Sequence, residues 1–352
     1  MESAIDQASR QKMTITSQGA NPKEDLYAAI MICVIAITGL LTNGLAILTV
    51  FRKKHLHNSF GYTCISHAAG GFGVLCIFAF WVTPILFMKP SVVPRIMEHS
   101  RLSYTVGQVT IFFYYGAIYT HVLLASNRFI VICKPLSYSS YFSIRMTIYW
   151  IILVWVIAFI QSAIYQIDGC HYFFEKTFLN FVYSQTQCGL FMSSKFEFCI
   201  NIMFVIFIML VDTLTSIKLK ISAKVNQARA IVSEAALNRR RSQEIRFFLQ
   251  SVCSEVTIVV CFSSFWGFSR LAESKWATFL LTTIAWELLH AFDGVILIAF
   301  NRNVHFLWCL RRRKQPPQSR ESVDLKITRK GRIKWPHLNT GDRAIKHFVQ
   351  PT

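Results

Sequence analysis

Charged residues are scarce in this chain. Only 16% of its 352 residues are Asp, Glu, Lys or Arg, whereas 53% are hydrophobic. Soluble globular proteins carry about 25% charged residues, so this shortage excludes an ordinary soluble protein. The hydrophobic residues lie in long runs, each close to or above the ~20 residues that a helix needs to cross a bilayer core.

The sequence also lacks the short motifs that mark several kinds of chemistry. It has no H-E-x-x-H, G-x-S-x-G or phosphate-binding loop, which argues against an enzyme. Its 10 cysteines show no C-x-x-C spacing, so we expect neither a metal site nor a cofactor. Alternating segments of strand length are missing, which argues against an outer-membrane barrel. The polar amino-terminal residues contain no cleavable signal peptide.

What the sequence does contain is a set of seven apolar runs. In hydrocarbon every backbone N–H and C=O must be hydrogen-bonded within the protein, so runs of this length predict helices. We therefore predict an all-α fold, a seven-transmembrane helix bundle over residues 26–302. The predicted helices cover residues 26–51, 60–87, 104–133, 146–167, 196–217, 247–269 and 277–300.

Positive charge is distributed unevenly between the two sides of these runs. Most of the 37 lysines and arginines lie on the side that holds the loop 218–246 and the carboxyl-terminal tail. The positive-inside rule then places the N-terminus outside the cell and the C-terminus in the cytoplasm. We attribute the net charge of +19 to orientation and to contact with membrane lipids, and we expect no nucleic-acid binding.

Three segments lie outside the predicted bundle. Residues 1–25 form a polar extracellular segment. Residues 303–314 carry an apolar stripe followed by arginines and predict an amphipathic helix in the membrane interface. Residues 315–352 predict a basic, disordered cytoplasmic tail. Cys309 is positioned for palmitoylation, although a lone cysteine at such a place is more often unmodified.

The longest predicted extracellular loop runs from Asp168 to Lys195 and contains Cys170 and Cys188. Most other cysteines lie within the predicted helices, where they behave as small apolar residues. Because the extracellular side is oxidising, we predict a Cys170–Cys188 disulfide that shapes a lid over the bundle.

Several polar side chains interrupt the predicted helices. A charge within a membrane span is costly and therefore marks a functional candidate. The alternative role is a hydrogen bond that holds helices together. On the last helix Glu287, His290 and Gly294 share one face, while Asp293 points elsewhere. The candidates are Asn43, Asp212, Glu255, Trp266, Glu287, His290 and Asp293.

The stretch "NRFIVICKPLSY" at 127–138 places Arg128 at the inner end of the third predicted helix, before an aliphatic run and a loop proline. This pattern resembles seven-helix G-protein-coupled receptors. A closer resemblance is to the nematode serpentine chemoreceptors of class x, and it covers roughly Leu26 to Arg302. The stretches that carry it are residues 57–84, "GQ" at 107–108, "HVLLASNRF" at 121–129, "CG" at 188–189 and "WELLHAFDG" at 286–294.

The resemblance implies a chemosensory receptor in the plasma membrane of sensory neurons. A small-molecule ligand would bind among the helices from outside, and a heterotrimeric G protein would dock where the inner helix ends open. In that scheme Asn127, Arg128 and Phe129 form the coupling region. We expect Glu244 to pair with Arg128 at rest; the alternative is a solvated Glu244 among neighbouring arginines.

The sequence departs from the rhodopsin-like pattern at several places. Asn127 replaces the acidic residue that usually precedes the arginine, and no proline follows Trp266. The last helix has no N-P-x-x-Y, and Asp293 and Gly294 stand in that region. Gly71 occupies a position where class x leads us to expect an asparagine.

Two other functions stay open at the level of sequence. A multi-pass transporter or ligand-gated channel would suit the carboxylates near the middle of the membrane, although the odd helix number and the lack of an internal repeat argue against it. A receptor-like protein that has lost signalling would keep every feature described above. A retinal pump is set aside, because residues 277–300 contain no lysine.

Overall fold

The structure, a computed structural model, describes residues 22–88, 100–228 and 234–300. Within these ranges, the side chains of His55 and of residues 223–248 are not described. The predicted amphipathic segment with Cys309, the predicted tail and most of the predicted extracellular segment lie outside the described residues.

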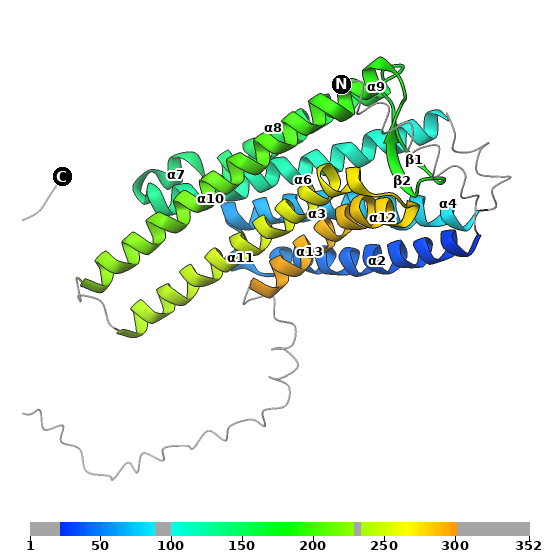
Figure 1. Ribbon diagram of the computed structural model, residues 1–352. Coiled ribbons are helices and arrows are strands. Elements are labelled where there is room, and N and C mark those ends of the chain that lie inside the picture. The colour runs from blue at the N-terminus through cyan, green and yellow to red at the C-terminus, as the bar shows by residue number, and fades with distance from the viewer. Residues whose placement is uncertain (1–21, 89–99, 229–233, 301–352) are drawn as a thin grey trace, which may run out of the picture. The chain divides into compact units, whose positions relative to one another are not determined.

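Seven helical segments in the described part of the chain are long and apolar enough to cross a membrane. They confirm the predicted all-α, seven-helix architecture (Figure 1). In chain order the spans are Pro22–Arg52, Ser59–Phe87, Arg101–Cys133, Ile144–Gln166, Gln187–Ser222, Leu249–Leu271 and Lys275–Phe300.

Most spans consist of more than one helical element. Three of the elements, η2, η5 and η7, are π-helical turns, which widen the helix locally and are frequent at functional sites. The spans are built from α2 (Pro22–Arg52), α3 (Ser59–Ile77), η2 (Phe78–Val82), α4 (Thr83–Phe87), α6 (Arg101–Cys133), α8 (Ile144–Ala163), η4 (Ile164–Gln166), α9 (Gln187–Phe191), η5 (Met192–Phe196), α10 (Glu197–Ala228), α11 (Glu234–Trp266), η6 (Phe268–Leu271), α12 (Lys275–Phe279), η7 (Leu280–Ile284) and α13 (Ala285–Phe300). The connections contain η1 (Lys54–Leu56), η3 (Pro135–Ser137) and α7 (Tyr138–Tyr141).

Local sequence fixes where five of these spans begin. Each begins after a residue whose side-chain oxygen accepts a hydrogen bond from a backbone N–H in the first turn, which otherwise has no partner. These capping residues are Asn58, Ser100, Ser143, Thr186 and Ser274.

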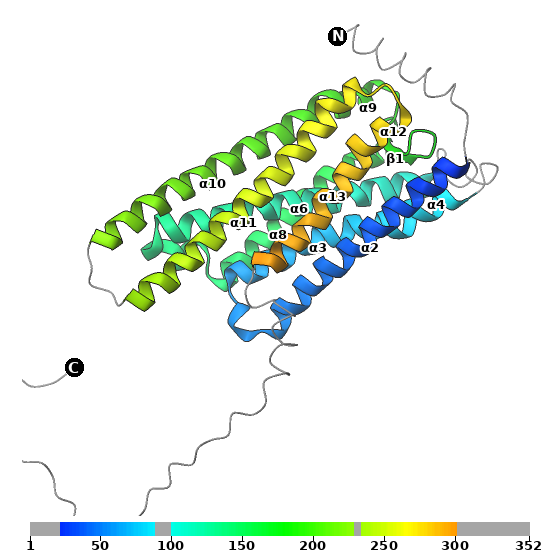
Figure 2. The same cartoon turned by 60° about the horizontal axis from the view of Figure 1, so that its bottom comes forward.

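Helices α3, α6 and α13 form the centre of the bundle. Helix α3 packs against α2, α6, α8 and α13, and α6 also contacts α8 and α10. Helix α13 contacts α2 and α11, and α10 contacts α11 (Figures 1 and 2). A polar side chain on a central helix therefore faces other helices, whereas the outer helices also have a face that points away from the bundle.

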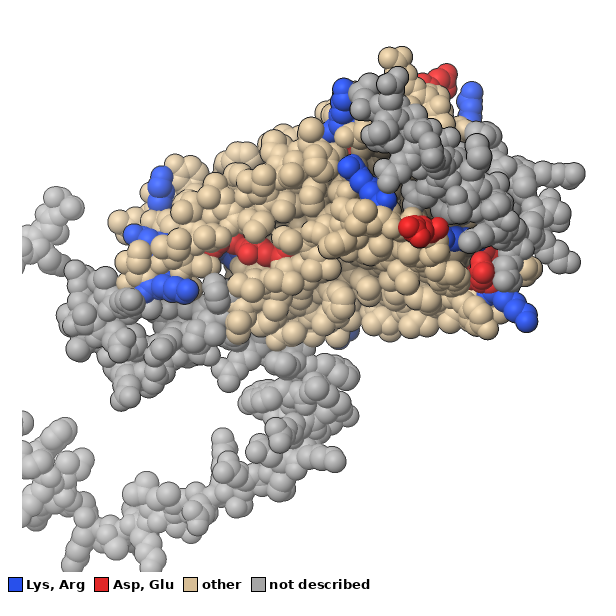
Figure 3. All heavy atoms as spheres, viewed as in Figure 1, with Lys and Arg blue, Asp and Glu red and all other residues tan. Residues whose placement is uncertain are grey.

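The outer face of the bundle is apolar. Leu41, Phe80 and Ile160 are 69%, 74% and 63% exposed, and the flank in Figure 3 is almost entirely uncharged. Exposed side chains of this kind are costly in water and favourable against lipid tails, so the surface fits a bilayer-spanning protein.

Small residues allow the central helices to approach closely. A Cβ atom at Gly70, on α3, would lie 2.7 Å from the backbone nitrogen of Ala117 on α6. Association of helices in lipid depends on such close packing, because lipid removes most of the hydrophobic driving force.

One end of the bundle is covered by a short β-hairpin, which the sequence analysis did not anticipate. Strands β1 (Tyr172–Glu175) and β2 (Asn180–Tyr183) pair antiparallel with Tyr172 opposite Tyr183. The backbone of Tyr172 lies against α6 at Gly107, where any Cβ atom would meet the Tyr172 carbonyl oxygen at 1.6 Å. We call this end of the bundle the hairpin end and the opposite end the arginine end, after Arg128.

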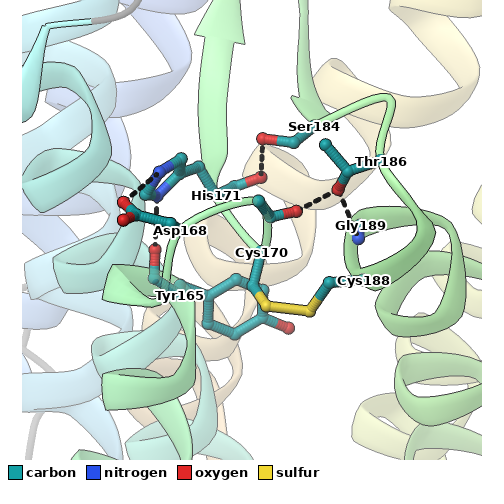
Figure 4. The surroundings of a disulfide bond; sticks show 9 residues. Tyr165, Asp168, Cys170, His171, Ser184, Thr186, Cys188 and Gly189 are labelled. Atoms are coloured by element: carbon teal, nitrogen blue, oxygen red, sulfur yellow. Dashed lines mark hydrogen bonds and ion pairs between the residues drawn. A yellow bond between two sulfur atoms is a disulfide. The ribbon is translucent and has the colours of Figure 1, made fainter.

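A disulfide joins Cys170 to Cys188, between the segment before β1 and helix α9 (Figure 4). Hydrogen bonds reinforce the link on both sides: the hydroxyl of Thr186 donates to the carbonyl of Gly169, and that of Ser184 donates to the carbonyl of His171 at 3.3 Å. The hairpin is thereby held beside the start of the fifth span.

Two lysines pair with one aspartate near the hairpin end, and one of them joins the hairpin to neighbouring helices. Asp25, on α2, accepts ion pairs from Lys176 in the hairpin turn at 3.3 Å and from Lys275 on α12 at 3.4 Å. Lys176 also donates to the carbonyl oxygens of Leu86 and Met88 at the end of α4. Because free carbonyls at a helix C-terminus attract cations, this lysine stabilises both the hairpin and the helix end.

The fifth span differs most from its predicted bounds. It begins at Gln187, well before the predicted start at residue 196, and passes through the π turn η5. Lys195 is exposed on this helix, so its charge does not end the helix. The first span begins at Pro22, which places Asp25 in the first helical turn, where acidic side chains are favourable.

The close contact at Gly70 predicts a sensitive position. We expect Gly70→Ala to destabilise the protein by about 1–3 kcal/mol, because the added methyl group must push α3 away from α6. Gly44→Ala is the matched control, since a Cβ atom there meets only Phe72 at 3.6 Å. Thermal unfolding of both variants in detergent measures the difference. Equal midpoints would contradict the packing described here.

Candidate functional site

A cavity lies between α6, α10, α11 and α13 and extends to the β-hairpin. Its wall is predominantly apolar and aromatic, as is usual for small-molecule sites. The polar side chains on it are His67, His121, Glu197, Asn201, His290 and Asp293. The aromatic ones are Tyr114, Tyr172, Tyr183, Phe204, Phe262, Phe265, Trp266 and Trp286.

The hairpin contributes two tyrosines to the cavity wall. Tyr172 and Tyr183 face each other across the strand pair with ring centroids 4.7 Å apart, and both line the cavity. Burial, and after it the nearby Glu197 carboxylate, raises the pKa of both phenols well above the usual value. They are therefore neutral hydrogen-bonding groups at physiological pH.

Glu197 is the carboxylate closest to the hairpin on the cavity wall. It follows the π turn η5 directly, and only 2% of its surface is exposed. The hydroxyl groups of Tyr115 and Tyr165 and the side-chain amide of Asn201 all donate hydrogen bonds to it. Tyr114 in turn donates to the Asn201 side-chain oxygen at 2.5 Å.

Deeper in the bundle, histidines and an aspartate form a second polar group. His67 on α3 lies 3.4 Å from Asp293 on α13, and its Nδ1 lies 3.0 Å from the carbonyl oxygen of Ala117. Because a carbonyl only accepts, that nitrogen carries a proton. The ring of His121 packs edge-on against His67 with centroids 5.2 Å apart.

Residues of the first and last spans meet beside this group. Asn43 donates to the carbonyl oxygen of His290 at 3.0 Å, which is an interhelical hydrogen bond. A Cβ atom at Gly71 would lie 3.5 Å from the Asn43 side-chain oxygen and 3.7 Å from His290 Nδ1. Both of these atoms lack a hydrogen-bond partner among the described residues. Gly71 is the position at which the resemblance to class x predicts an asparagine.

Glu287 lies on α13 and is fully buried, but it does not line the cavity. Its carboxyl group receives no hydrogen bond from a side chain that the structure describes, and the backbone of Ala36 lies close enough to favour its charged form. Trp266, at the hairpin end of α11, does line the cavity and packs against Phe198 with centroids 5.4 Å apart. The candidates from the sequence are therefore divided between the cavity wall and the helix contacts around it.

At the arginine end, Arg128 on α6 pairs with Asp212 on α10. The distance between Nη2 and Oδ2 is 2.7 Å, and the two side chains are 7% and 1% exposed. Glu255, on α11, is half-buried and close enough to interact electrostatically with both groups. The structure thus brings α6, α10 and α11 together around one cation. Figure 3 shows acidic atoms on this flank, with Lys and Arg atoms beyond them towards the same end.

The partner that the structure gives Arg128 is Asp212, where the sequence analysis expected Glu244. Glu244 lies among the residues whose side chains are not described. Asn127 is buried and donates to Ser59 on α3 at 2.9 Å, and it lies 3.3 Å from the hydroxyl of Tyr138. Phe129 is half-buried. Asn127 therefore ties α6 to α3 and leaves Arg128 as the charged member of this segment.

Sequence reasoning missed several residues of the cavity. Glu197 was the second residue of a predicted helix, and a carboxylate there is a signal that could have been used. His121 was visible as a polar interruption of the third run, but nothing in the sequence pairs it with His67. The two hairpin tyrosines lie in a predicted loop in which the sequence showed no strand pattern.

Comparison with known proteins decides the family. The family described as "Serpentine type 7TM GPCR chemoreceptor Srx" matches residues 33–301 of this chain, which is most of its length. The chain belongs to the Srx family of serpentine chemoreceptors. This Srx chain is accordingly a multi-pass membrane protein of a receptor family, and that family is not a class of enzymes.

Curated relatives and a solved structure agree with this assignment. Serpentine receptor class X 45 of Caenorhabditis elegans is 27% identical over 86% of this chain and 85% of its own length. Serpentine receptor class X-43 of the same species is 24% identical over 85% of this chain and 91% of its own length. The crystal structure of squid rhodopsin matches with a TM-score of 0.65 at 16% identity, over 85% of this chain and 89% of the other. The Srx chain therefore has a rhodopsin-like fold.

Two atoms beside Gly71 have no hydrogen-bond partner among the described residues, and they give a testable prediction. We expect Gly71→Asn to stabilise this Srx chain by about 1 kcal/mol, because an amide there can bond the Asn43 oxygen in a buried setting. The gain should disappear in an Asn43→Ala background, which a double-mutant cycle of thermal unfolding measures. A gain that persists without Asn43 would mean that the added side chain acts through some other contact.

Proposed function

We propose that this chain is a chemosensory G-protein-coupled receptor of the plasma membrane, with its N-terminus outside and its C-terminus in the cytoplasm. A small molecule binds in the cavity at the hairpin end, and a heterotrimeric G protein binds at the arginine end. The chemoreceptor family to which the chain belongs supports expression in sensory neurons. The observation that carries the proposal is that the same two helices, α6 and α10, build both ends.

Helix α6 carries Tyr114 on the cavity wall and Arg128 at the arginine end. Helix α10 carries Glu197 and Asn201 on the cavity wall and Asp212 at the arginine end. Along a helix, 14 or 15 residues span roughly 21–23 Å. A ligand that moves α10 against α6 in the cavity therefore also changes the distance between Arg128 and Asp212.

The Arg128–Asp212 pair gives the resting state its stability. Removing one partner of a buried ion pair costs roughly 3–5 kcal/mol, because the other charge is left without compensation. Separation of the pair is favourable only if ligand binding, a G protein or both stabilise the open state. A ligand with higher affinity for that state shifts the population towards it, and a shift from 1:99 to 99:1 needs about 5.5 kcal/mol.

In the open state Arg128 becomes available to a partner in the cytoplasm. Asn127 and Phe129 flank it, and we assign these three residues to the G-protein contact. Glu244, on the segment of α11 that continues past the membrane, is a second anion that can receive Arg128 during the transition. Glu255 already lies near the pair.

A transporter or ligand-gated channel is the alternative, since carboxylates near the middle of the membrane suit ion coupling. A receptor-like protein without signalling is a further alternative. Arg128 and Asp293 favour the receptor, because both are engaged with groups on neighbouring helices. Ligand-dependent current in liposomes that contain no G protein would favour the transporter or channel.

The ion pair predicts signalling in the absence of any ligand. In cells with a promiscuous G protein, we expect Asp212→Asn to raise basal signalling several-fold, because it frees Arg128. The double variant Asp212→Asn/Arg128→Ala should return signalling to background, since the residue that contacts the G protein is then missing. Surface expression of each variant is the control.

Two results would contradict this proposal. One is unchanged basal signalling in Asp212→Asn at normal surface level. The other is raised signalling that survives in the double variant, which would exclude Arg128 as the coupling residue.

A further inference from the structure

The hydrogen bonds around Glu197 build a site for a negative charge. All three of its described partners are donors: Tyr115 at 2.5 Å, Tyr165, and the Asn201 amide at 3.1 Å. A carboxylate only accepts, so donors from α6, η4 and α10 converge on the charged form of this side chain. Glu287 is buried to a similar degree and has no such donors, which shows that burial alone does not create this arrangement.

No cation balances this charge within the described residues. Lys195, two residues before Glu197, is exposed, and the ion pairs that the structure describes join Asp25, Asp168, Asp212 and Asp293 to their own partners. A buried anion without a counter-charge is costly even when it is hydrogen-bonded. Its two oxygens offer about four acceptor positions, and the three donors occupy three of them.

The space in front of Glu197 is lined by aromatic faces. Tyr114 packs edge-on against Trp286 with centroids 5.5 Å apart, and Tyr172 and Tyr183 close the cavity from the hairpin. Rings of this kind attract a cation through their negative faces, with a benefit that grows when the cation is desolvated. An aromatic wall with one carboxylate is therefore suited to an ammonium group on an organic skeleton.

The second anion on the cavity wall does not change this conclusion. Asp293 is paired with His67, and His121 and His290 lie beside it. An anionic ligand would face both Asp293 and Glu197. A neutral ligand would leave Glu197 without a counter-charge, so the wall favours a cation over either alternative.

We propose that the cavity binds a small protonated amine, whose ammonium group pairs with Glu197 and whose organic part packs against the tyrosines and tryptophans. This inference names the ligand class of the function proposed above and rests on it. The cavity volume of about 80 Å³ exceeds the roughly 10–15 Å³ that one water needs on the same measure. The cavity therefore has room for a ligand larger than a water molecule.

The test uses matched series of three skeletons: propyl, 2-phenylethyl and indol-3-ylethyl. Each skeleton is offered as an amine, as the corresponding alcohol and as the corresponding carboxylate, to the purified full chain in nanodiscs. Binding is measured by ligand-observed NMR and by thermal shift. We expect at least one amine to bind, and to bind at least about tenfold more tightly than its alcohol and its carboxylate.

Two variants identify the carboxylate. Glu197→Gln keeps the shape and removes the charge, and it should weaken the amine at least about tenfold while leaving the alcohol unchanged. Glu287→Gln is the matched control, a buried glutamate on a neighbouring helix outside the cavity wall, and it should leave amine binding unchanged. Without any amine, Glu197→Gln should unfold at the same or a higher temperature than the wild type, because an uncompensated charge is removed.

Several outcomes overturn the ligand class. They are tighter binding of an alcohol or a carboxylate, equal loss of amine binding in both variants, an amine affinity that Glu197→Gln leaves unchanged, or no binding in any series. A lower unfolding temperature of Glu197→Gln together with unchanged amine affinity would make Glu197 a structural residue.

Failure of the ligand class is distinguishable from failure of the receptor function. Amine binding that depends on Glu197 without any G-protein response in cells leaves the ligand class intact and contradicts the receptor. A response to an alcohol or a carboxylate that is lost in Arg128→Ala supports the receptor and overturns the amine.

Discussion

The bilayer core contains no water, and this constraint explains most of the polar structure of the bundle. A charge on a spanning helix must find its partner on another helix, because lipid tails offer none. Arg128 and Asp212 meet across α6 and α10, and His67 and Asp293 meet across α3 and α13. Such pairs join helices that are far apart in sequence and give the bundle discrete arrangements. Glu197 departs from the rule within the described residues, and its departure suggests what the cavity is built to receive.

The architecture could be predicted from the sequence because hydrophobic length is a strong physical signal. A helix needs about 20 apolar residues to cross the membrane, and seven runs of that length left little freedom in the fold. The pairing of Cys170 with Cys188 could also be predicted, because one predicted extracellular loop contained both cysteines. The ends of the helices were harder to predict. Helix α9 and the π turn η5 extend the fifth span through Lys195, because a long lysine side chain is tolerated on a helix surface as well as in a loop.

The contacts between helices could not be predicted, because they depend on rotation and register. Arg128 had anionic candidates on two helices, and only the packing of α6 against α10 selects Asp212. The π turn η5 changes the register just before Glu197, so helical spacing counted along the sequence does not give its orientation. The β-hairpin was missed because its strands have four residues each, too few for a clear alternation. The π turn and the hairpin lie around the cavity, where functional requirements override local sequence preferences.

Transmission of a signal along the bundle requires a membrane between its two ends, with the hairpin end outside and the arginine end inside. The most direct measurement places different epitope tags at the amino and carboxyl termini and stains intact and permeabilised cells. We expect the amino-terminal tag to be accessible on intact cells and the carboxyl-terminal tag only after permeabilisation. Staining of both tags on the same side, or the reverse pattern, would contradict transmission of an external chemical signal to Arg128.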